Sequence, residues 1–284
     1  MPHELQGRHA VITGASRGFG REIARHFARA GAHLYLLARD SGSLEETCAL
    51  ARAESADPAQ TVAMQTADLS DLASLPAVFA ALPAVDILVN NAGMQGPIGP
   101  FETQDPAAWR AVFAVNFLAA AECCRLVLPG MKERGRGKIV NISGGGATGP
   151  RVDFSAYAAS KAALVRFSET LAEEVREAGI DVNCVAPGAM NTRMLSEVIA
   201  AGPERARQEY ARALDQEQAG GTPPETGAEL VLFLASQASD GITGRLLSAL
   251  WDEWRELPTR REALARTDVY TLRRIVPLDR GLAW

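Results

Sequence analysis

The fold of this chain is decided by one stretch, His9-Ala-Val-Ile-Thr-Gly-Ala-Ser-Arg-Gly-Phe-Gly20. It opens as a short apolar run, turns on three glycines and continues directly into a helical pattern. A strand, a glycine-rich turn and a helix in this order form the phosphate-binding unit of a dinucleotide fold. Glycine lets the backbone pass close to a pyrophosphate, and the helix N-terminus offers unpaired N–H groups and a positive dipole. We therefore expect a dinucleotide to contact the turn at Gly14, Ser16, Arg17, Gly18, Phe19 and Gly20.

Outward from this stretch, short apolar runs alternate with longer segments whose apolar residues recur at helical spacing. We expect strands at 9–13, 33–38, 61–65, 86–90, 138–142, 181–186 and 245–249, and helices at 18–30, 43–54, 71–81, 106–128, 155–178 and 225–235. Strict alternation implies right-handed crossovers, a parallel sheet and helices on both of its faces. The predicted fold is a doubly wound, Rossmann-type α/β sheet in three αβα layers, built as a single domain.

No internal linker, repeat or low-complexity segment divides the chain. We assign residues 1–250 to the Rossmann-type domain, and residues 189–220 within it to a loop that frames the substrate. The tail 251–284 carries seven arginines and no clear strand. We expect this tail to pack on the domain surface or on a partner subunit.

The composition is that of an ordinary globular protein, with 47% hydrophobic and 22% charged residues. A net charge of −5 argues against nucleic acid as a partner, because nucleic acid favours a basic surface. No apolar run approaches the ~20 residues that span a bilayer, and the polar N-terminus lacks the apolar stretch of a signal peptide. We therefore expect no membrane partner and a cytoplasmic location.

The placement of cysteine and histidine disfavours several chemistries. Cys48, Cys123, Cys124 and Cys184 show no C-x-x-C spacing, so we expect free thiols in a reducing compartment. All four histidines lie within the first 33 residues, which disfavours a zinc site, and we predict no metal. The turn also fits the G-x-S-x-G nucleophile elbow of α/β-hydrolases, but no histidine follows far along the chain to complete a triad.

A second motif, Tyr157-Ala-Ala-Ser-Lys161, places a phenol and an ammonium one helical turn apart. An ordinary tyrosine has a pKa of about 10, and a nearby positive charge lowers that pKa by favouring the phenolate. Such a phenol can give a proton to a carbonyl oxygen as hydride arrives, or accept one in reverse. Taken alone, this spacing also fits an ordinary helix pair.

Five ordered elements together resemble the short-chain dehydrogenases/reductases. Residues 13–20 match the TGxxxGxG turn of that family, 90–93 its NNAG element, Asn116 its helix asparagine, 157–161 its YxxxK and 187–192 its PGxxxT segment. The resemblance covers residues 5–248. It implies hydride transfer between a nicotinamide dinucleotide and a small carbonyl compound or secondary alcohol. It also implies a homodimer or homotetramer built on helices 106–128 and 155–178.

The resemblance gives each matching residue an expected role. Tyr157 would be the acid/base, Lys161 would hold the nicotinamide ribose and lower the pKa of the tyrosine, and Asn116 would anchor a water in a proton relay. The expected cofactor contacts beyond the glycine turn are Asp68, Leu69, Asn90, Ala92, Gly93, Tyr157, Lys161, Pro187, Gly188 and Thr192.

One position departs from the family pattern. The serine that polarises the substrate carbonyl normally stands 13 residues before the tyrosine, and Gly144 occupies that position here. Ser143 lies one residue earlier, and adjacent strand residues point to opposite faces unless the glycines that follow re-aim them. We take Ser143 as the polarising group, with Thr148 as a weaker stand-in.

Two arginines bear on the choice of dinucleotide. An acidic residue at the end of the second strand grips the ribose of NAD, but Ala38 stands there, followed by Arg39, and Arg17 lies in the turn. Guanidinium groups suit a 2′-phosphate, so we predict NADP(H) rather than NAD(H). In the alternative interpretation, Arg39 is solvated and Asp40 grips the ribose.

The segments expected to frame the substrate are 94–104, 145–154 and 189–220. They offer Met94, Phe154, Met190, Met194 and Leu195 and few charges, which favours a moderately apolar substrate. Trp251 and Trp254 either close the site, cover a neighbouring subunit or pack. Two other functions stay open: a non-catalytic NADP(H)-binding sensor, suggested by Gly144, and an epimerase or dehydratase on the same fold.

Overall fold

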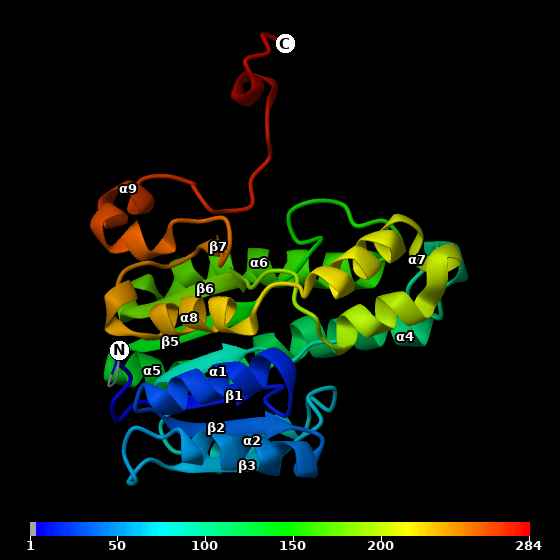
Figure 1. The fold of residues 1–284 in the computed structure, drawn as a ribbon. Helices are drawn as coiled ribbons and strands as arrows, with labels where there is room; N and C mark the ends of the chain where they lie inside the picture. The colour runs from blue at the N-terminus through cyan, green and yellow to red at the C-terminus, as the bar shows by residue number, and fades with distance from the viewer. Residues whose placement is uncertain (1–3) are drawn as a thin grey trace.

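The computed structural model describes residues 4–284, so positions 1–3 of the predicted domain lie outside the described residues. A seven-stranded sheet runs through the molecule in the order β3-β2-β1-β4-β5-β6-β7, and every strand pair is parallel (Figure 1). The strands are β1 (His9–Thr13), β2 (His33–Ala38), β3 (Val62–Thr66), β4 (Ile87–Asn90), β5 (Gly137–Ile142), β6 (Ile180–Ala186) and β7 (Leu246–Ser248). The doubly wound sheet predicted from the alternation is confirmed.

Helices cover both faces of the sheet. They are α1 (Gly18–Arg29), α2 (Ser41–Ala53), α3 (Leu75–Ala80), α4 (Pro106–Phe113), α5 (Ala119–Arg134), α6 (Ser155–Val175), α7 (Arg193–Ala219), α8 (Pro224–Ala235) and α9 (Arg261–Ala265). Side chains of α1, α2 and α8 share one buried cluster, and those of α3, α5 and α6 share another. Along β1, Ala10 and Ile12 belong to the first cluster and Val11 to the second, because successive side chains of a strand face opposite sides.

β1 lies between β2 and β4, where the chain order of the sheet reverses. At such a point the loops leaving the two strand ends diverge and open a crevice, where ligands of doubly wound folds bind. The loop after β1 is the glycine turn, and the loop after β4 begins at Asn91. The fold therefore brings the first and the fourth strand ends to one site.

The predicted helix 106–128 consists of three consecutive segments. After α4, a π-helical turn covers Ala114–Leu118, and α5 then runs to Arg134 through Pro129. Proline is a usual signal for a helix end, but the structure accommodates it here without a break. α5 ends at Gly135, which takes the left-handed conformation with φ of 64°.

The run Pro106–Arg134 is, by length and composition, apolar enough to cross a membrane, because it contains an 18-residue window with a mean hydropathy of 1.8. The sequence analysis looked for a continuous apolar run, and none of that length is present here, whereas an average tolerates scattered charges such as Glu122 and Arg125. Val112, Cys123 and Met131 of this run are buried in the structure, so part of its surface packs in the core.

The segment 189–220, expected to be a loop, is mostly the helix α7. The backbone breaks at Gly202 and Arg207, where φ is 76° and 43°, and the helix forms two limbs at the right of Figure 1. Gly202-Pro203 has the composition of a helix end, so the local sequence does not indicate one continuous helix here. Both limbs are helical because Val198 and Ala213 pack in a cluster with Tyr157.

The tail 251–284 begins on the body of the molecule. Trp254 is buried in the cluster of α1 and α8, and the guanidinium of Arg245 donates to three main-chain carbonyl oxygens between 264 and 269. The N–H of Leu272 donates to a carboxylate of α6 at 2.6 Å. Beyond it the chain leaves the surface, and Trp284 is 85% exposed (Figure 1).

Candidate active site

A cleft of about 1650 Å³ opens at the carboxyl edge of the sheet and extends from the end of β2 to α7. Every predicted cofactor contact except Asn90 lines this cleft, and so do Ser143, Tyr157 and Lys161. Pockets for one small molecule measure about 300–1000 Å³. The volume is therefore sufficient for a dinucleotide together with a small second ligand.

The glycine turn has the geometry that a diphosphate requires. φ is 65° at Gly14 and 54° at Gly18, a conformation that favours glycine. A Cβ added at Gly20 would lie 2.3 Å from the carbonyl oxygen of Gly14, so no larger residue fits there. No side chain caps the N-terminus of α1. Its first N–H groups are therefore available to a phosphate, and the turn fits a dinucleotide.

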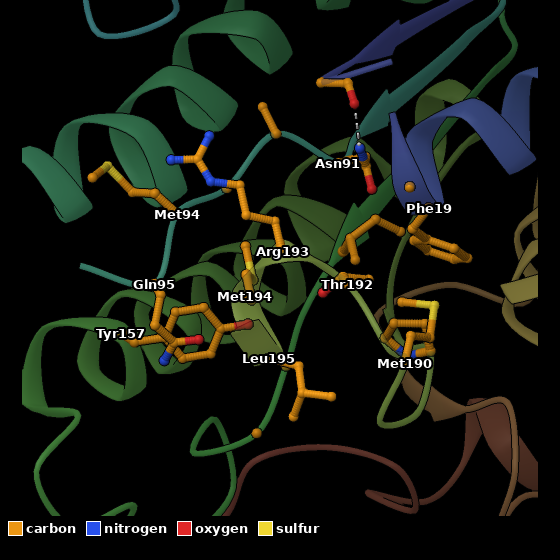
Figure 2. Close-up of a pocket in the computed structure, with 18 of the residues that line it drawn as sticks. Phe19, Asn91, Met94, Gln95, Tyr157, Met190, Thr192, Arg193, Met194 and Leu195 are labelled. Atoms are coloured by element: carbon orange, nitrogen blue, oxygen red, sulfur yellow. Dashed lines mark hydrogen bonds between the residues drawn. The ribbon is translucent and has the colours of Figure 1, made fainter. Parts of the chain in front are cut away.

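Asn91, which the sequence analysis did not single out, fastens this turn to β4. Its Nδ2 donates to the carbonyl oxygens of Thr13 and Gly14 at 3.0 and 3.1 Å. The Oγ1 of Thr13 in turn accepts from the N–H groups of Asn91 and Ala92 at 3.0 and 3.1 Å. Figure 2 shows Asn91 beside the start of α1, in the same cleft as Tyr157.

Asn90 is the one predicted cofactor contact that the structure places elsewhere. Its side chain is buried, and its Nδ2 donates to the Oδ1 of Asn141 on β5 at 2.8 Å. The Nδ2 of Asn141 donates in turn to the hydroxyl of Ser168 in α6 at 2.7 Å. The prediction is corrected: neighbouring strand residues point to opposite faces, so of the two asparagines Asn91 faces the cleft and Asn90 joins β4 to β5.

The adenosine end of the cleft is lined by Arg17 and Arg39, both exposed. Asp40, which the alternative interpretation assigned to the ribose, accepts a hydrogen bond from the N–H of Ser43 at 2.7 Å and caps α2. Hydrogen bonding from the side chain and then the N–H of Ser43, with a smaller contribution from the charge of Arg17, lowers the pKa of Asp40. The carboxylate is thus engaged at the helix end, although Asp40 lines the cleft together with the two guanidiniums.

Tyr157 and Lys161 lie together on α6 and are both buried. The Nζ of Lys161 lies 5.8 Å from the centre of the tyrosine ring and donates to the carbonyl oxygen of Ile142 at 2.7 Å. Burial lowers the pKa of Lys161 to about 8. Burial also raises the pKa of Tyr157, and the positive charge of Arg151, 5.6 Å from the ring, opposes that rise. In the chain alone, desolvation therefore outweighs the lowering of the tyrosine pKa that the sequence predicted.

Asn116 lies behind this pair, in the π-helical turn that the sequence analysis did not foresee. Its Oδ1 accepts from the N–H of Met94 at 2.8 Å, and its Nδ2 donates to the Met94 carbonyl oxygen at 3.0 Å and to the hydroxyl of Ser160 at 3.1 Å. These bonds occupy the side-chain amide and hold the loop after β4 against α6. The expected role of Asn116 in a proton relay stays a prediction.

Gly144 faces the hydroxyl of Tyr157, since a Cβ added there would lie 2.3 Å from the phenolic oxygen. Ser143 is buried, and no described residue is within hydrogen-bonding reach of its Oγ. The N–H of Ser143 donates to the carbonyl oxygen of Val185 at 2.8 Å, so the strand ladder continues to this residue. Ser143 therefore lies in extended backbone, where its side chain points away from the direction of Gly144.

The opposite end of the cleft is lined by residues of α7, both apolar side chains such as Met194 and charged ones such as Arg193 and Glu197 (Figure 2). The expected side chains that line it are Met94, Met190, Met194 and Leu195. Arg151 of the loop before α6 donates to Glu209 of α7 at 2.9 Å, so an ion pair joins loop and helix. Phe154 is buried under this loop rather than in the lining.

Gln95 is a further lining residue that the sequence analysis missed. It is 3% exposed, and its Nε2 is buried with no hydrogen-bond partner among the described residues. Its place two residues after the NNAG element was the available signal. Local composition gave no sign that a loop glutamine would be buried.

Among residues 4–284, no three histidine, cysteine or acidic side chains are grouped so that they could hold a metal ion. All four cysteines are free and buried, as the sequence predicted.

Comparison with known proteins identifies the family. Residues 8–202 match the family model described as short chain dehydrogenase. The chain belongs to the short-chain dehydrogenase family. This short-chain dehydrogenase is 36% identical to 2-keto-3-deoxy-L-fuconate dehydrogenase of Xanthomonas campestris over 248 residues, which covers 85% of this chain and 78% of the relative. It is 38% identical to galactitol 2-dehydrogenase (L-tagatose-forming) of Cereibacter sphaeroides over 252 residues, 86% of this chain and 94% of the relative.

Solved structures agree with this assignment. The short-chain dehydrogenase superposes on a variant of actinorhodin polyketide ketoreductase with NADPH at a TM-score of 0.78, with 29% identity over 87% of this chain and 97% of that one. L-sorbose reductase from Gluconobacter frateurii, complexed with NADPH and L-sorbose, gives a TM-score of 0.75 with 29% identity and the same coverage, 87% and 97%. The predicted family and Rossmann-type fold are confirmed, and the chain is an oxidoreductase of this family.

Proposed function

We propose that this short-chain dehydrogenase transfers hydride between NADP(H) and a small carbonyl compound or secondary alcohol. The observation that carries the proposal is the position of Tyr157. Its hydroxyl faces the bare backbone of Gly144, beside Lys161, in the cleft that begins at the glycine turn. A buried phenol next to a buried amine, at one end of a dinucleotide-sized cleft, suits proton transfer coupled to hydride transfer.

Tyr157 gives its proton to the carbonyl oxygen during reduction and takes it from the alcohol during oxidation. The ammonium of Lys161 donates one hydrogen bond to the Ile142 carbonyl oxygen, and its other two N–H groups are available to the ribose hydroxyls of the cofactor. Asn116 keeps residue 94 in place opposite α6. A bound nicotinamide would supply or accept the hydride, and its positive charge in the oxidised form would favour the phenolate.

The preference for NADP(H) rests on the adenosine end of the cleft. Arg17 and Arg39 offer two guanidiniums to a 2′-phosphate, and Asp40 is engaged as the cap of α2. The two solved relatives named above contain NADPH. Asp68 and Thr192 line the cleft at positions that suit adenine and nicotinamide contacts.

The substrate class follows from the lining and from the relatives. The apolar side chains of the α7 end leave room for a small carbon chain, with Arg151 at its edge. The names of the relatives refer to galactitol, L-tagatose and 2-keto-3-deoxy-L-fuconate. We infer a secondary alcohol or ketone that carries further polar groups.

We also propose a cytoplasmic homodimer or homotetramer in which α4, α5 and α6 form the interface. Only 39% of the apolar window in Pro106–Arg134 is buried within one chain, and Leu118 is 43% exposed. The proposed domain is 1–250, with a tail 251–284 packed on it. Leu278 and Trp284 at the end of that tail are exposed and suit contact with a partner subunit.

The proposal is tested by replacing Tyr157. Galactitol, D-β-hydroxybutyrate and L-sorbose, with NADP⁺ or NADPH as the direction requires, form a first substrate panel. Tyr157→Phe should lower kcat by about 10³-fold, because the general acid is removed, while the Kd for NADPH is unchanged. Tyr270→Phe, on the tail and away from the cleft, is the matched control and should keep full activity. Full activity in Tyr157→Phe would overturn the assignment of the acid, and tight NADPH binding without turnover of a broader carbonyl panel would favour a sensor.

A further inference from the structure

Gln95 presents a buried amide that no described residue engages. The residue is 3% exposed, its Nε2 has no hydrogen-bond partner, and it lines the cleft. Buried amide groups in folded proteins are almost always hydrogen-bonded, and leaving one unpaired destabilises the fold. An unpaired donor in the wall of a ligand cleft therefore points to an acceptor on the ligand.

The segment that carries Gln95 is held against the catalytic pair. A Cβ added at Gly93 would lie 3.4 Å from the Oδ1 of Asn116 and 3.6 Å from the Nζ of Lys161. Met94 exchanges hydrogen bonds with Asn116 through both its main-chain N–H and its carbonyl oxygen. Gln95 follows directly and lines the same cleft as Tyr157, and both side chains are drawn in Figure 2.

The same place in the cleft lacks a donor from β5. Gly144 has no side chain, although its missing Cβ points at the phenolic oxygen of Tyr157. The hydroxyl of Ser143 is buried on the other side of the extended backbone. Two buried side-chain donors of the described residues line the cleft without a partner, the Ser143 hydroxyl and the Gln95 amide, and the extended backbone turns the hydroxyl away from the direction of Gly144.

We propose that the Nε2 of Gln95 donates a hydrogen bond to the substrate oxygen that Tyr157 protonates, and so replaces the serine that is absent at position 144. This inference rests on the proposed function. In reduction, hydride adds to the carbonyl carbon, the C=O π electrons move to oxygen, and Tyr157 delivers the proton to that oxygen. The amide of Gln95 stabilises the negative charge as it develops and gives up no proton.

Three variants test this role, each assayed for kcat, KM and NADPH binding on the substrate panel above. Gln95→Leu keeps the size of the side chain and removes the donor, so kcat should fall by about 10²-fold with little change in NADPH affinity. Ser143→Ala should retain kcat within about twofold. Gln65→Leu on β3, the same exchange outside the cleft, should behave as the unmodified enzyme.

Gln95→Glu separates a catalytic from a structural role. A carboxyl group at this buried position donates only while it is protonated, so the ratio of its kcat to that of the unmodified enzyme should rise as the pH falls. A purely structural defect would leave this ratio independent of pH. The proposal is overturned if Gln95→Leu keeps its kcat, if Ser143→Ala loses it instead, or if the Gln95→Glu ratio is flat.

The results also distinguish a failure of this inference from a failure of the proposed hydride-transfer function. If Tyr157→Phe is inactive and Gln95→Leu is fully active, the hydride-transfer function stands and Gln95 is not the donor. If Tyr157→Phe is fully active, or the unmodified enzyme turns over no carbonyl compound, both proposals fail together.

Discussion

The backbone of Gly144 is packed against the hydroxyl of Tyr157 so closely that a Cβ would lie 2.3 Å from the phenolic oxygen. Real Cβ atoms are essentially never found at such a distance from another heavy atom, so any side chain at 144 must displace the phenol or the strand end. The position at which the sequence analysis expected a serine is thus fitted to glycine in this chain. The placement of the acid/base depends on that fit.

Gly144→Ala should therefore impair the enzyme, although it adds one methyl group. A displacement of about 1 Å at a reacting group costs about 10²-fold in rate, and we expect a loss of that order in kcat. Gly149→Ala, in the same loop where an added Cβ would meet nothing within 4 Å, is the control. Gly144→Ser should not improve the enzyme, and a rise in kcat in that variant would contradict this packing.

The binding of NADPH should weaken as the pH rises through about 8, the pKa to which burial lowers Lys161. Below this pH the ammonium donates to the ribose hydroxyls, and above it a proton and a positive charge are lost. If binding requires the charged amine, the Kd should rise about tenfold from pH 7 to pH 9. Fluorescence titration of NADPH measures this, and Lys161→Met should bind more weakly with no such dependence. A Kd of the unmodified enzyme that is constant over this range would exclude the charge as a requirement.

Arg39→Ala should change the cofactor preference more than the chemistry. A charge-assisted hydrogen bond to a phosphate contributes about 1.5–3 kcal/mol, so kcat/KM for NADPH should fall about 10- to 100-fold. The value for NADH should change little, because that cofactor has no 2′-phosphate. Arg274→Ala on the exposed tail is the control for a lost surface charge. An equal loss with both cofactors would place Arg39 outside the phosphate site.

The ion pair between Arg151 and Glu209 should couple the loop before α6 to α7. Both side chains are about one-fifth exposed, at 20% and 21%, so the pair is partly shielded from water. We expect either single alanine variant to raise KM, and the double variant to be less impaired than the sum of the singles by about 1 kcal/mol. Steady-state kinetics at low and high salt provide the measurement. If the free-energy effects of the two substitutions were strictly additive, the ion pair would not couple the loop to α7.

The features predicted correctly from the sequence are those encoded locally. Glycine spacing in the turn and the four-residue separation of Tyr157 and Lys161 are fixed by backbone geometry, so they could be assigned without a fold. The parallel sheet could be predicted because each strand is a short apolar run between two segments with helical spacing. These signals require no knowledge of what lies across the cleft.

The features that were missed depend on tertiary contacts. Residues 189–220 were expected to be a substrate-framing loop, whereas both limbs of α7 are helical and pack in the cluster of Tyr157 across the break at Gly202. Asn90 and Asn91 could not be told apart until the face of β4 was known. Neither the burial of Gln95 nor the π-helical turn at Asn116 could be predicted from the neighbouring residues, because burial of a loop amide results from the surrounding fold.

The hydrogen bonds between Asn91 and the glycine turn have a consequence for how new substrates could be accommodated. They tie the cofactor-binding turn to the strand that precedes Gln95, so this turn and the loop after β4 are held together at the ends of β1 and β4. α7, which covers the substrate end, contributes nothing to that link. We therefore expect substitutions at α7 positions that line the cleft outside the cluster of Tyr157, such as Glu197 and Gln216, to change the substrate range while cofactor affinity stays with the sheet.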